Sequence, residues 1–182
     1  MGLFNNKTQQ ITQRQKLEYR YNSARNNILW VLIFTVVNIG LLLAGRFSYF
    51  LFSAYVPYAI VDSGMYFCGR YPEWFYMGEY YLESYYASSV LIVMVAIAAV
   101  ICIVYLLCWL FSKKGRVGWM IAGLVLFTVD TVLLLLNGIN FDFILDYLFH
   151  AWVVVSFITG VSAHYKLKKL PPEEPVGPEI VE

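Results

Sequence analysis

The chain has 182 residues, of which 60% are hydrophobic and only 14% are charged, and its formal net charge is +1. A soluble domain needs about 25% charged residues to cover its surface, so this composition excludes an ordinary soluble protein. The charges are also clustered, which leaves long uncharged stretches and indicates an integral membrane protein with a single membrane domain.

Residues 1–27 form a basic N-terminal arm. Within it, residues 7–27 (KTQQITQRQKLEYRYNSARNN) carry five basic residues and one acid. Because Ile11, Leu17 and Tyr21 are spaced among these charges, we predict an amphipathic helix on the cytoplasmic membrane surface, with a solvated arm as the alternative. The arm differs from a signal peptide because its first apolar stretch begins only at Ile28.

Four apolar stretches are long enough to cross a bilayer, which takes about 20 residues. They occupy residues 28–45, 88–111, 117–138 and 144–165. The final residues 166–182 include the proline- and glutamate-rich sequence LPPEEPVGPEIVE, which predicts a disordered cytoplasmic tail. The expected fold class is therefore all-α, a polytopic four-helix membrane bundle formed by residues 28–165.

The distribution of positive charge predicts the orientation. Eleven of the 13 Lys and Arg residues lie in the arm, in 113–116 (KKGR) or in 164–169 (HYKLKK). Four spans place these three groups on one side of the membrane, whereas a fifth span within 46–87 would separate the arm from the other two. The positive-inside rule therefore favours four spans with both termini cytoplasmic.

The long connection 46–87 is rich in aromatic residues, with ten Tyr, five Phe and one Trp. Aromatic side chains with one polar end favour the headgroup level, so we predict an outer interfacial segment. Pro57 and Gly64 are expected to interrupt any regular helix there. Two interpretations remain open: a cap over the bundle, and a recognition surface for a glycan, a peptide or a lipid headgroup.

The last two spans carry polar residues at matching depths. They form an antiparallel hairpin that turns at residues 137–140 (NGIN). Asp130 lies ten residues before Asn140 and His150 lies ten residues after it. At about 1.5 Å of rise per residue, both side chains lie about 10–15 Å below the outer helix ends. Asp130 and His150 are therefore predicted to be level, and they meet if their helix faces turn together.

A polar stripe extends from this pair toward the outer surface. Asp142, Asp146 and His150 follow each other in steps of four, and Asn137 follows Asp130 by seven. Charge inside a membrane costs several kcal/mol unless it is paired or hydrated, so such residues are functional candidates. The predicted site for a proton or a cation consists of Asp130, Asp146, His150, Asn137 and Asp142.

The same residues also have structural interpretations. Asp146 and His150 can satisfy each other within one helix, and Asp130 can bond to Thr131, Asn38 or Ser156 as interhelical packing. Thr35 and Asn38 of the first span are expected to approach the site. Separately, Ser156, Gly160 and His164 predict a stripe for close helix packing.

Motifs for enzymatic chemistry are missing from the sequence. Cys68, Cys102 and Cys108 have no spacing typical of a disulfide framework, a zinc site or a redox pair. No phosphate loop, catalytic triad motif or HExxH pattern occurs. The sequence therefore favours a protein that is not an enzyme and needs no cofactor, and it leaves a metal open.

The stretches YFLFSAYVPYAIV, VMVAIAAVICIVYLLCWLFSKKGRVGWMIAGLVLF, FHAW and KLKKLP carry a resemblance to known sequences. The chain resembles an uncharacterised family of small four-span membrane proteins of Gram-positive bacteria, over nearly all residues after 28. The resemblance implies a bacterial origin and a place in the cell membrane. It supplies no activity and no functional residue.

These observations lead to three functional hypotheses. The first is a non-enzymatic accessory or interaction subunit, with the lipid bilayer and a membrane protein or a second copy of the chain as partners, and without nucleic acid. The second is a small proton- or cation-coupled carrier or channel that uses the intramembrane Asp/His site. A membrane hydrolase is third, because no nucleophile or metal triad has a suitable spacing.

Overall fold

The computed structural model of the chain describes residues 13–46, 48–77, 84–138 and 141–171. In these ranges the regular structure is entirely helical. The five α-helices are α1 (Gln13–Leu43), α2 (Tyr55–Phe67), α3 (Ser88–Phe111), α4 (Val117–Leu136) and α5 (Ile144–Lys169). Three short 3-10 turns accompany them, η1 (Glu73–Tyr76), η2 (Lys113–Gly115) and η3 (Phe141–Phe143).

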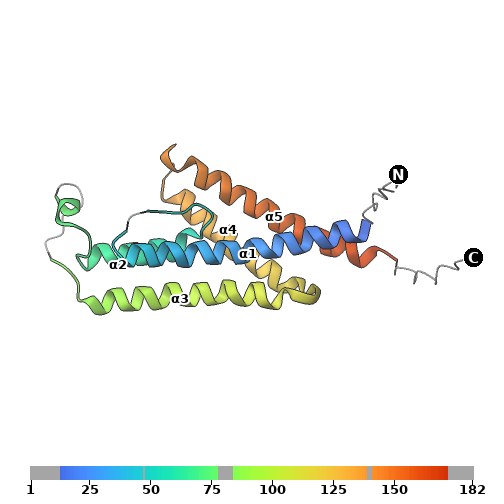
Figure 1. The fold of residues 1–182 in the computed structure, drawn as a ribbon, viewed down its shortest axis with the longest axis horizontal. Coiled ribbons are helices and arrows are strands. Elements are labelled where there is room, and N and C mark those ends of the chain that lie inside the picture. The colour runs from blue at the N-terminus through green and yellow to red at the C-terminus, as the bar shows by residue number, and fades with distance from the viewer. Residues whose placement is uncertain (1–12, 47, 78–83, 139–140, 172–182) are drawn as a thin grey trace, which may run out of the picture.

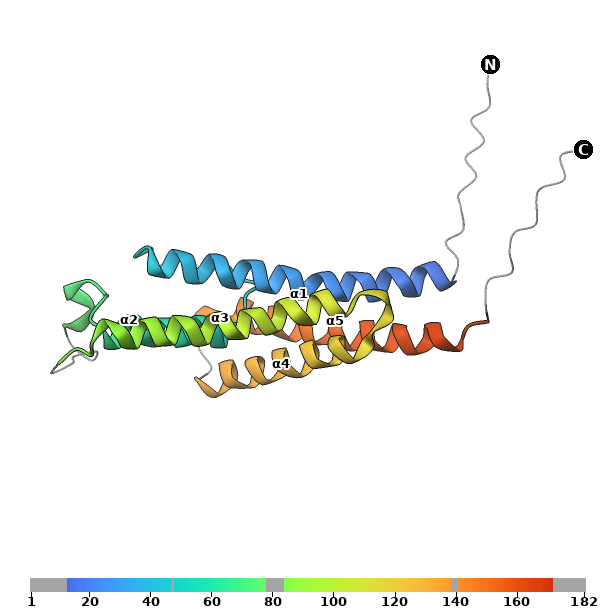
Figure 2. The ribbon, with the colours of Figure 1, turned by 90° about the horizontal axis from the view of Figure 1, so that it is seen from below.

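Four of these helices, α1, α3, α4 and α5, are long and apolar enough to cross a membrane. They lie along the long axis of the molecule, and α2 occupies one end of the bundle (Figures 1 and 2). Only 17% of the residues in the apolar part of α3 are buried, so most of that helix presents apolar side chains to the surroundings. The expected all-α fold with four long apolar helices is confirmed, and these helices are suited to a bilayer.

The first turn of α1 and the last turn of α5 lie at the same end of the bundle (Figure 1). The guanidinium of Arg14 donates a 2.7 Å hydrogen bond to the carbonyl of Pro171. The α3–α4 connection reaches this end too, because the Tyr21 hydroxyl donates a 2.6 Å bond to the carbonyl of Ser112. The three basic groups of the sequence therefore converge on one end in the described part of the chain.

The first helix begins at Gln13 and runs without a break into the first apolar stretch. No proline or glycine interrupts residues 13–39, so nothing in the sequence ends the helix at residue 27. Leu17, Tyr21 and Ala24 are buried against the bundle. The described part of the arm is therefore helical, and one face of it packs on the rest of the protein. Its place on a membrane surface stays a prediction. Ile11 falls outside the described residues, as does the tail after residue 171.

Small residues set the contact between α1 and α5, as the stripe at Ser156, Gly160 and His164 predicted. A Cβ atom on Gly160 would lie 2.4 Å from the Cβ of Ala24, so the two helices approach closely at this point. Ser156 accepts a 2.7 Å hydrogen bond from Asn27, and the ring of His164 lies 5.6 Å from that of Tyr21. This prediction is confirmed.

The segment after α1 differs most from the sequence-based expectation. The chain turns at Gly45, which has a φ of +70°, and runs back along α1 until the backbone N–H of Ala54 reaches the hydroxyl of Thr35 at 2.7 Å. Thr35 lies eight residues before Leu43, so the chain re-enters the bundle by about 12 Å. Helix α2 then runs outward again beside α3 (Figure 1). Part of the aromatic connection therefore lies within the bundle.

Helix α2 contains both residues that were expected to interrupt it, so that expectation is wrong. Pro57 falls in the first turn, where a helix leaves its backbone N–H groups without partners in any case. Gly64 faces α3, where an added Cβ would lie 2.9 Å from the sulfur of Met94. Val61 and Met65 complete a small core with Leu42 and Ala98. Burial of this face stabilises α2 despite its glycine.

Candidate functional site

Asp130 of α4 holds the first turn of α2. Its Oδ2 accepts a 2.9 Å hydrogen bond from the backbone N–H of Tyr55, and its Oδ1 accepts a 2.8 Å bond from that of Val56. The side chain is 3% exposed. The N-terminus of a helix carries unpaired N–H groups and a positive dipole, so a carboxylate is a favourable partner there. Asp130 thereby joins α4 to α2, which follows the segment that returns into the bundle (residues 48–54, the re-entrant segment).

His150 of α5 lies against the same carboxylate. Its Nε2 is 3.3 Å from Oδ2 of Asp130, and its Nδ1 is 2.9 Å from the backbone carbonyl of Asp146. The side chain is fully buried, and its ring stacks on Phe127 with centroids 5.0 Å apart. The equal offsets of Asp130 and His150 from the hairpin turn predicted that the two side chains are level, with a contact if their helix faces turn together, and they are in contact.

The partners of His150 constrain the protons at the site. Both ring nitrogens face oxygen atoms, and the carbonyl of Asp146 can only accept, so Nδ1 carries a proton. One further proton then fits between Nε2 and Asp130, either on the imidazole or on the carboxyl. Both arrangements give the pair no net charge, which is the condition for burying it at low cost.

Asp146 is the second carboxylate of the cluster. It is 2% exposed, its Oδ2 lies 3.3 Å from the hydroxyl of Tyr49, and its Oδ1 has no hydrogen-bond partner among the described residues. That Oδ1 is 3.9 Å from Nδ1 of His150. Since Tyr49 also accepts a 2.8 Å bond from Ser53, its own hydroxyl proton is available for Asp146. Asp146 therefore keeps one oxygen free for a further partner.

The polar residues of α1 form hydrogen bonds with the re-entrant segment and not with Asp130. Asn38 accepts a 2.8 Å bond from the N–H of Phe50 and donates to the carbonyl of Phe50 and to Ser53 at 2.7 and 2.9 Å. Phe52 has a φ of +75°, which a bulky residue rarely adopts, and its ring packs edge-on against Phe149 at 4.3 Å. Packing and hydrogen bonds together hold this strained turn.

A cavity of about 470 Å³ leads to Asp146 from the C-terminal end of α4. Tyr49, Tyr55, Tyr58 and Tyr147 line it together with Asp62 and Asp146. Asn137, one of the predicted site residues, is exposed and also lines this cavity. Asp130 and His150 do not belong to the lining, so they lie behind Asp146 in sealed packing.

Asp142 is the one predicted site residue that the structure leaves unplaced. It falls in η3, just before α5, and its side chain lies outside the described residues. The structure thus brings together Asp130, Asp146 and His150 and sets Asn137 on the approach to them. Tyr49 and Ser53 join the network, and neither was predicted, because nothing in their sequence context signals that residues 48–54 return into the bundle.

Burial and neighbouring charge alter the acidity of groups at the α2 side of the cavity. Burial raises the pKa of the Asp62 carboxyl, although a hydrogen bond from the hydroxyl of Tyr71 opposes the shift. Burial, aided by the nearby Asp62 carboxylate, raises the pKa of Tyr58 to about 12. Tyr58 therefore stays neutral in the physiological range, and Asp62 is the group on α2 whose charge can change.

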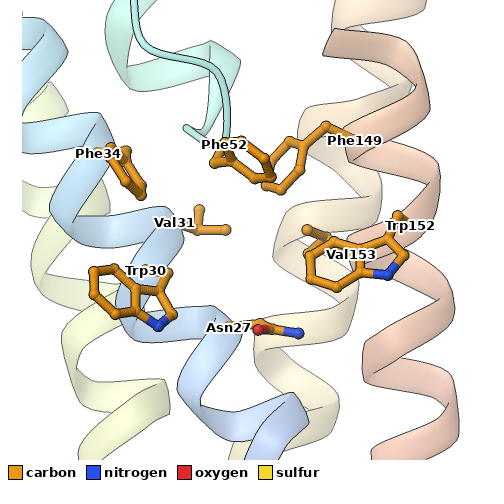
Figure 3. Close-up of a pocket in the computed structure, with 8 residues that line it drawn as sticks. All are labelled: Asn27, Trp30, Val31, Phe34, Phe52, Phe149, Trp152 and Val153. Atoms are coloured by element: carbon orange, nitrogen blue, oxygen red, sulfur yellow. The ribbon is translucent and has the colours of Figure 1, made fainter. Parts of the chain in front are cut away.

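A second hollow, of about 330 Å³, lies between α1 and α5 on the side of the bundle. Figure 3 shows the rings of Trp30, Phe34, Phe52, Phe149 and Trp152 around it, with Asn27 at one end. Trp30 and Trp152 are more than half exposed. This lateral hollow contains no acid or base among the residues that line it, so it is an apolar surface rather than a chemical site.

In the described ranges, no group of three or more His, Cys, Asp or Glu side chains is arranged to hold a metal ion. The fold and its polar cluster define a helical membrane protein with a re-entrant helix and a buried Asp–His–Asp arrangement. No protein family, curated protein or solved structure matches this chain.

Proposed function

We propose that the protein is a small carrier or channel of a bacterial cell membrane that binds a proton or a cation at Asp146. The observation that carries the proposal is the cavity of about 470 Å³ that opens beside Asn137 and ends on this buried carboxylate. A carboxylate in a membrane needs a counter-charge or a proton, and Oδ1 of Asp146 has no hydrogen-bond partner in the part of the chain that the structure describes. A cation or proton from the cavity supplies it.

The orientation that we propose places the cavity on the outer side and both termini in the cytoplasm. Its support is the convergence of the basic residues at the opposite end, where Lys113 and Arg25 also lie 5.0 and 5.9 Å from the ring of Trp109. Cysteine substitutions test it in intact cells. We expect Arg70→Cys to react with an impermeant maleimide and Lys113→Cys to react only after lysis; the reverse labelling contradicts the orientation.

The polar cluster suggests how binding at Asp146 reaches the rest of the protein. His150 lies between the two carboxylates, and Asp130 holds the first turn of α2. A positive charge at Asp146 disfavours a proton on His150, since like charges repel. The shared proton then moves toward Asp130, which weakens its bonds to the N–H groups of Tyr55 and Val56. In this proposal, α2 is the element that responds to occupancy of the cavity.

Flux measurements in liposomes test the proposal. Purified protein is reconstituted with an internal pH dye, and a potassium diffusion potential provides the driving force for protons or added cations. We expect a pH-dependent flux that Asp146→Asn abolishes, because the neutral amide no longer attracts a cation. Glu73→Gln is the matched control, since Glu73 is exposed in η1 and outside the cavity lining. Absence of flux, or equal flux for Asp146→Asn and Glu73→Gln, contradicts the proposal.

The alternative is a non-enzymatic accessory or interaction subunit. Two observations favour it: both oxygens of Asp130 are engaged in capping α2, which is a structural role, and the lateral hollow presents large exposed aromatic side chains. Under this alternative the chain carries no flux by itself. His150→Gln and Asp130→Asn then leave binding to a membrane protein partner, or to a second copy of the chain, intact.

A further inference from the structure

The chemistry of the cavity narrows the class of cation, and this inference rests on the cation-binding function proposed for Asp146. Helix α2 turns one face toward the cavity, with Tyr55, Tyr58 and Asp62 at intervals of three and four residues. Tyr49 packs edge-on against Tyr58, with ring centroids 5.0 Å apart. The re-entrant segment and α2 thus build an aromatic wall.

Helix α5 supplies the opposite side of the cavity with Asp146 and Tyr147. The hydroxyl of Tyr147 donates a 3.0 Å hydrogen bond to the carbonyl of Gly138, which fixes the ring beside the α4–α5 connection. The lining therefore combines four tyrosines with two carboxylates, Asp62 and Asp146. The described residues of the lining include no Lys, Arg or His, so the electrostatic field of the cavity favours a cation.

Size and ligand type distinguish an organic cation from a metal ion. A volume of about 470 Å³ suits a small organic molecule, and the common range for such sites begins at about 300 Å³. The two carboxylates come from different helices, and among the described residues no third Asp, Glu, His or Cys side chain lines the cavity. Calcium and magnesium need six or more oxygen ligands, whereas aromatic faces attract quaternary and other substituted ammonium groups.

We infer that the cavity binds small organic ammonium cations, with the tyrosine rings around the substituted nitrogen and Asp62 and Asp146 as counter-charges. The inference does not rest on the volume alone. The Asp146 side chain is 2% exposed, lines the cavity and has an oxygen without a hydrogen-bond partner among the described residues. Binding requires no covalent step. Asp130 and His150 take no direct part in it, since they lie behind the lining.

Calorimetric titration of the purified full chain in detergent tests the inference with a matched pair of probes. Choline carries the quaternary ammonium, and 3,3-dimethylbutan-1-ol has nearly the same shape without the charge. We expect choline to bind at least about tenfold more tightly than the alcohol, which is the effect of a desolvated cation–aromatic contact. Equal affinity for the two probes, or no binding of choline, overturns the inference.

Substitutions then locate the site. Asp146→Asn and Asp62→Asn are each expected to weaken choline binding about tenfold, and Glu73→Gln to leave it unchanged. Tyr58→Leu removes a ring and is expected to weaken binding, whereas Tyr58→Phe keeps the ring and the affinity. If Tyr58→Leu does not fold, the comparison of Asp62→Asn with Glu73→Gln decides. Unchanged affinity in both Asp variants overturns the inference.

The choline titration and the flux measurement can each contradict one proposal without contradicting the other. Choline binding that depends on Asp146, in a protein without liposome flux, supports the ammonium site and contradicts only the carrier. Flux of protons or metal cations in a protein that does not bind choline supports the carrier and contradicts the ammonium site.

Discussion

Asp130 in α4 and Tyr55 at the first turn of α2 are 75 positions apart in the sequence, and the Asp130 carboxylate accepts the Tyr55 backbone N–H at 2.9 Å. This contact fixes the first turn of α2, which begins inside the bundle. It also explains why an apolar span tolerates an acid, since the carboxylate has two N–H donors and an imidazole around it.

Removal of the cap at Asp130 should destabilise the protein strongly. Asp130→Ala leaves the N–H groups of Tyr55 and Val56 buried without acceptors, and we expect a loss of about 3 kcal/mol. The midpoint of thermal unfolding in detergent measures it, with Glu73→Ala as the control on an exposed acid. Amide hydrogen exchange adds a local readout, because exchange at residues 55 and 56 should accelerate most. A variant as stable as Glu73→Ala contradicts the capping role.

The proton between His150 and Asp130 is directly observable. Nitrogen-15 NMR of labelled histidine should show a protonated Nδ1 and an Nε2 that shares its proton with the carboxylate, since both ring nitrogens face oxygen atoms. His164 provides an internal reference from the other end of α5. In Asp130→Asn the shared proton should vanish from the His150 spectrum. An unchanged His150 spectrum in that variant would show that the pair does not share a proton.

The contact between α1 and α5 should be sensitive to a single methyl group at Gly160. In Gly160→Ala the new Cβ would lie 2.4 Å from the Cβ of Ala24 and 2.8 Å from the Cε of Met120, so the helices must separate. We expect a loss of about 1–3 kcal/mol in the free energy of unfolding. Gly118→Ala is the matched control, because no atom lies within 4 Å of its added Cβ. Equal unfolding midpoints for the two variants contradict the close contact.

Ionisation of Asp62 should make the protein less stable as the pH rises. Its pKa lies above the ordinary value of 3.8 because the side chain is buried, so the folded state holds this proton more tightly than the unfolded state. The stabilisation of the folded state by this proton is greatest below pH 3.8 and is lost as the pH rises through the raised pKa. The hydrogen bond from Tyr71 lowers the pKa of Asp62, but burial has the larger effect. Asp62→Asn should therefore gain stability relative to the native chain over this window.

Unfolding midpoints of the native chain and Asp62→Asn, measured across this pH range, check the prediction. Tyr55, Tyr58 and Tyr71 are titratable neighbours of the carboxyl, and all three pKa values are raised, so these tyrosines remain neutral throughout the range. Glu73→Gln controls for the loss of a negative charge at the surface. Stability curves that stay parallel for the native chain and Asp62→Asn would contradict the raised pKa.

Periodicity and charge in the sequence were sufficient for the long helices, because an apolar stretch of about 20 residues has few alternatives to a helix in a membrane. They also placed Asp130 level with His150, since two antiparallel helices joined by a short turn have a fixed register. The close packing at Gly160 followed from residue size. These features depend on the spacing of residues along the chain, which can be determined from the sequence.

The tertiary structure alone decided the course of residues 48–67. Their composition suits an interfacial loop as well as a buried helix, and Pro57 and Gly64 argued against the helix. Acceptors from distant parts of the chain, Thr35, Asn38 and Asp130, make re-entry feasible by satisfying backbone N–H groups that lipid would leave unpaired. The same re-entry brings Tyr49 to Asp146 and creates the cavity, because the partners of a backbone group are set by the assembled bundle and not by neighbouring residues.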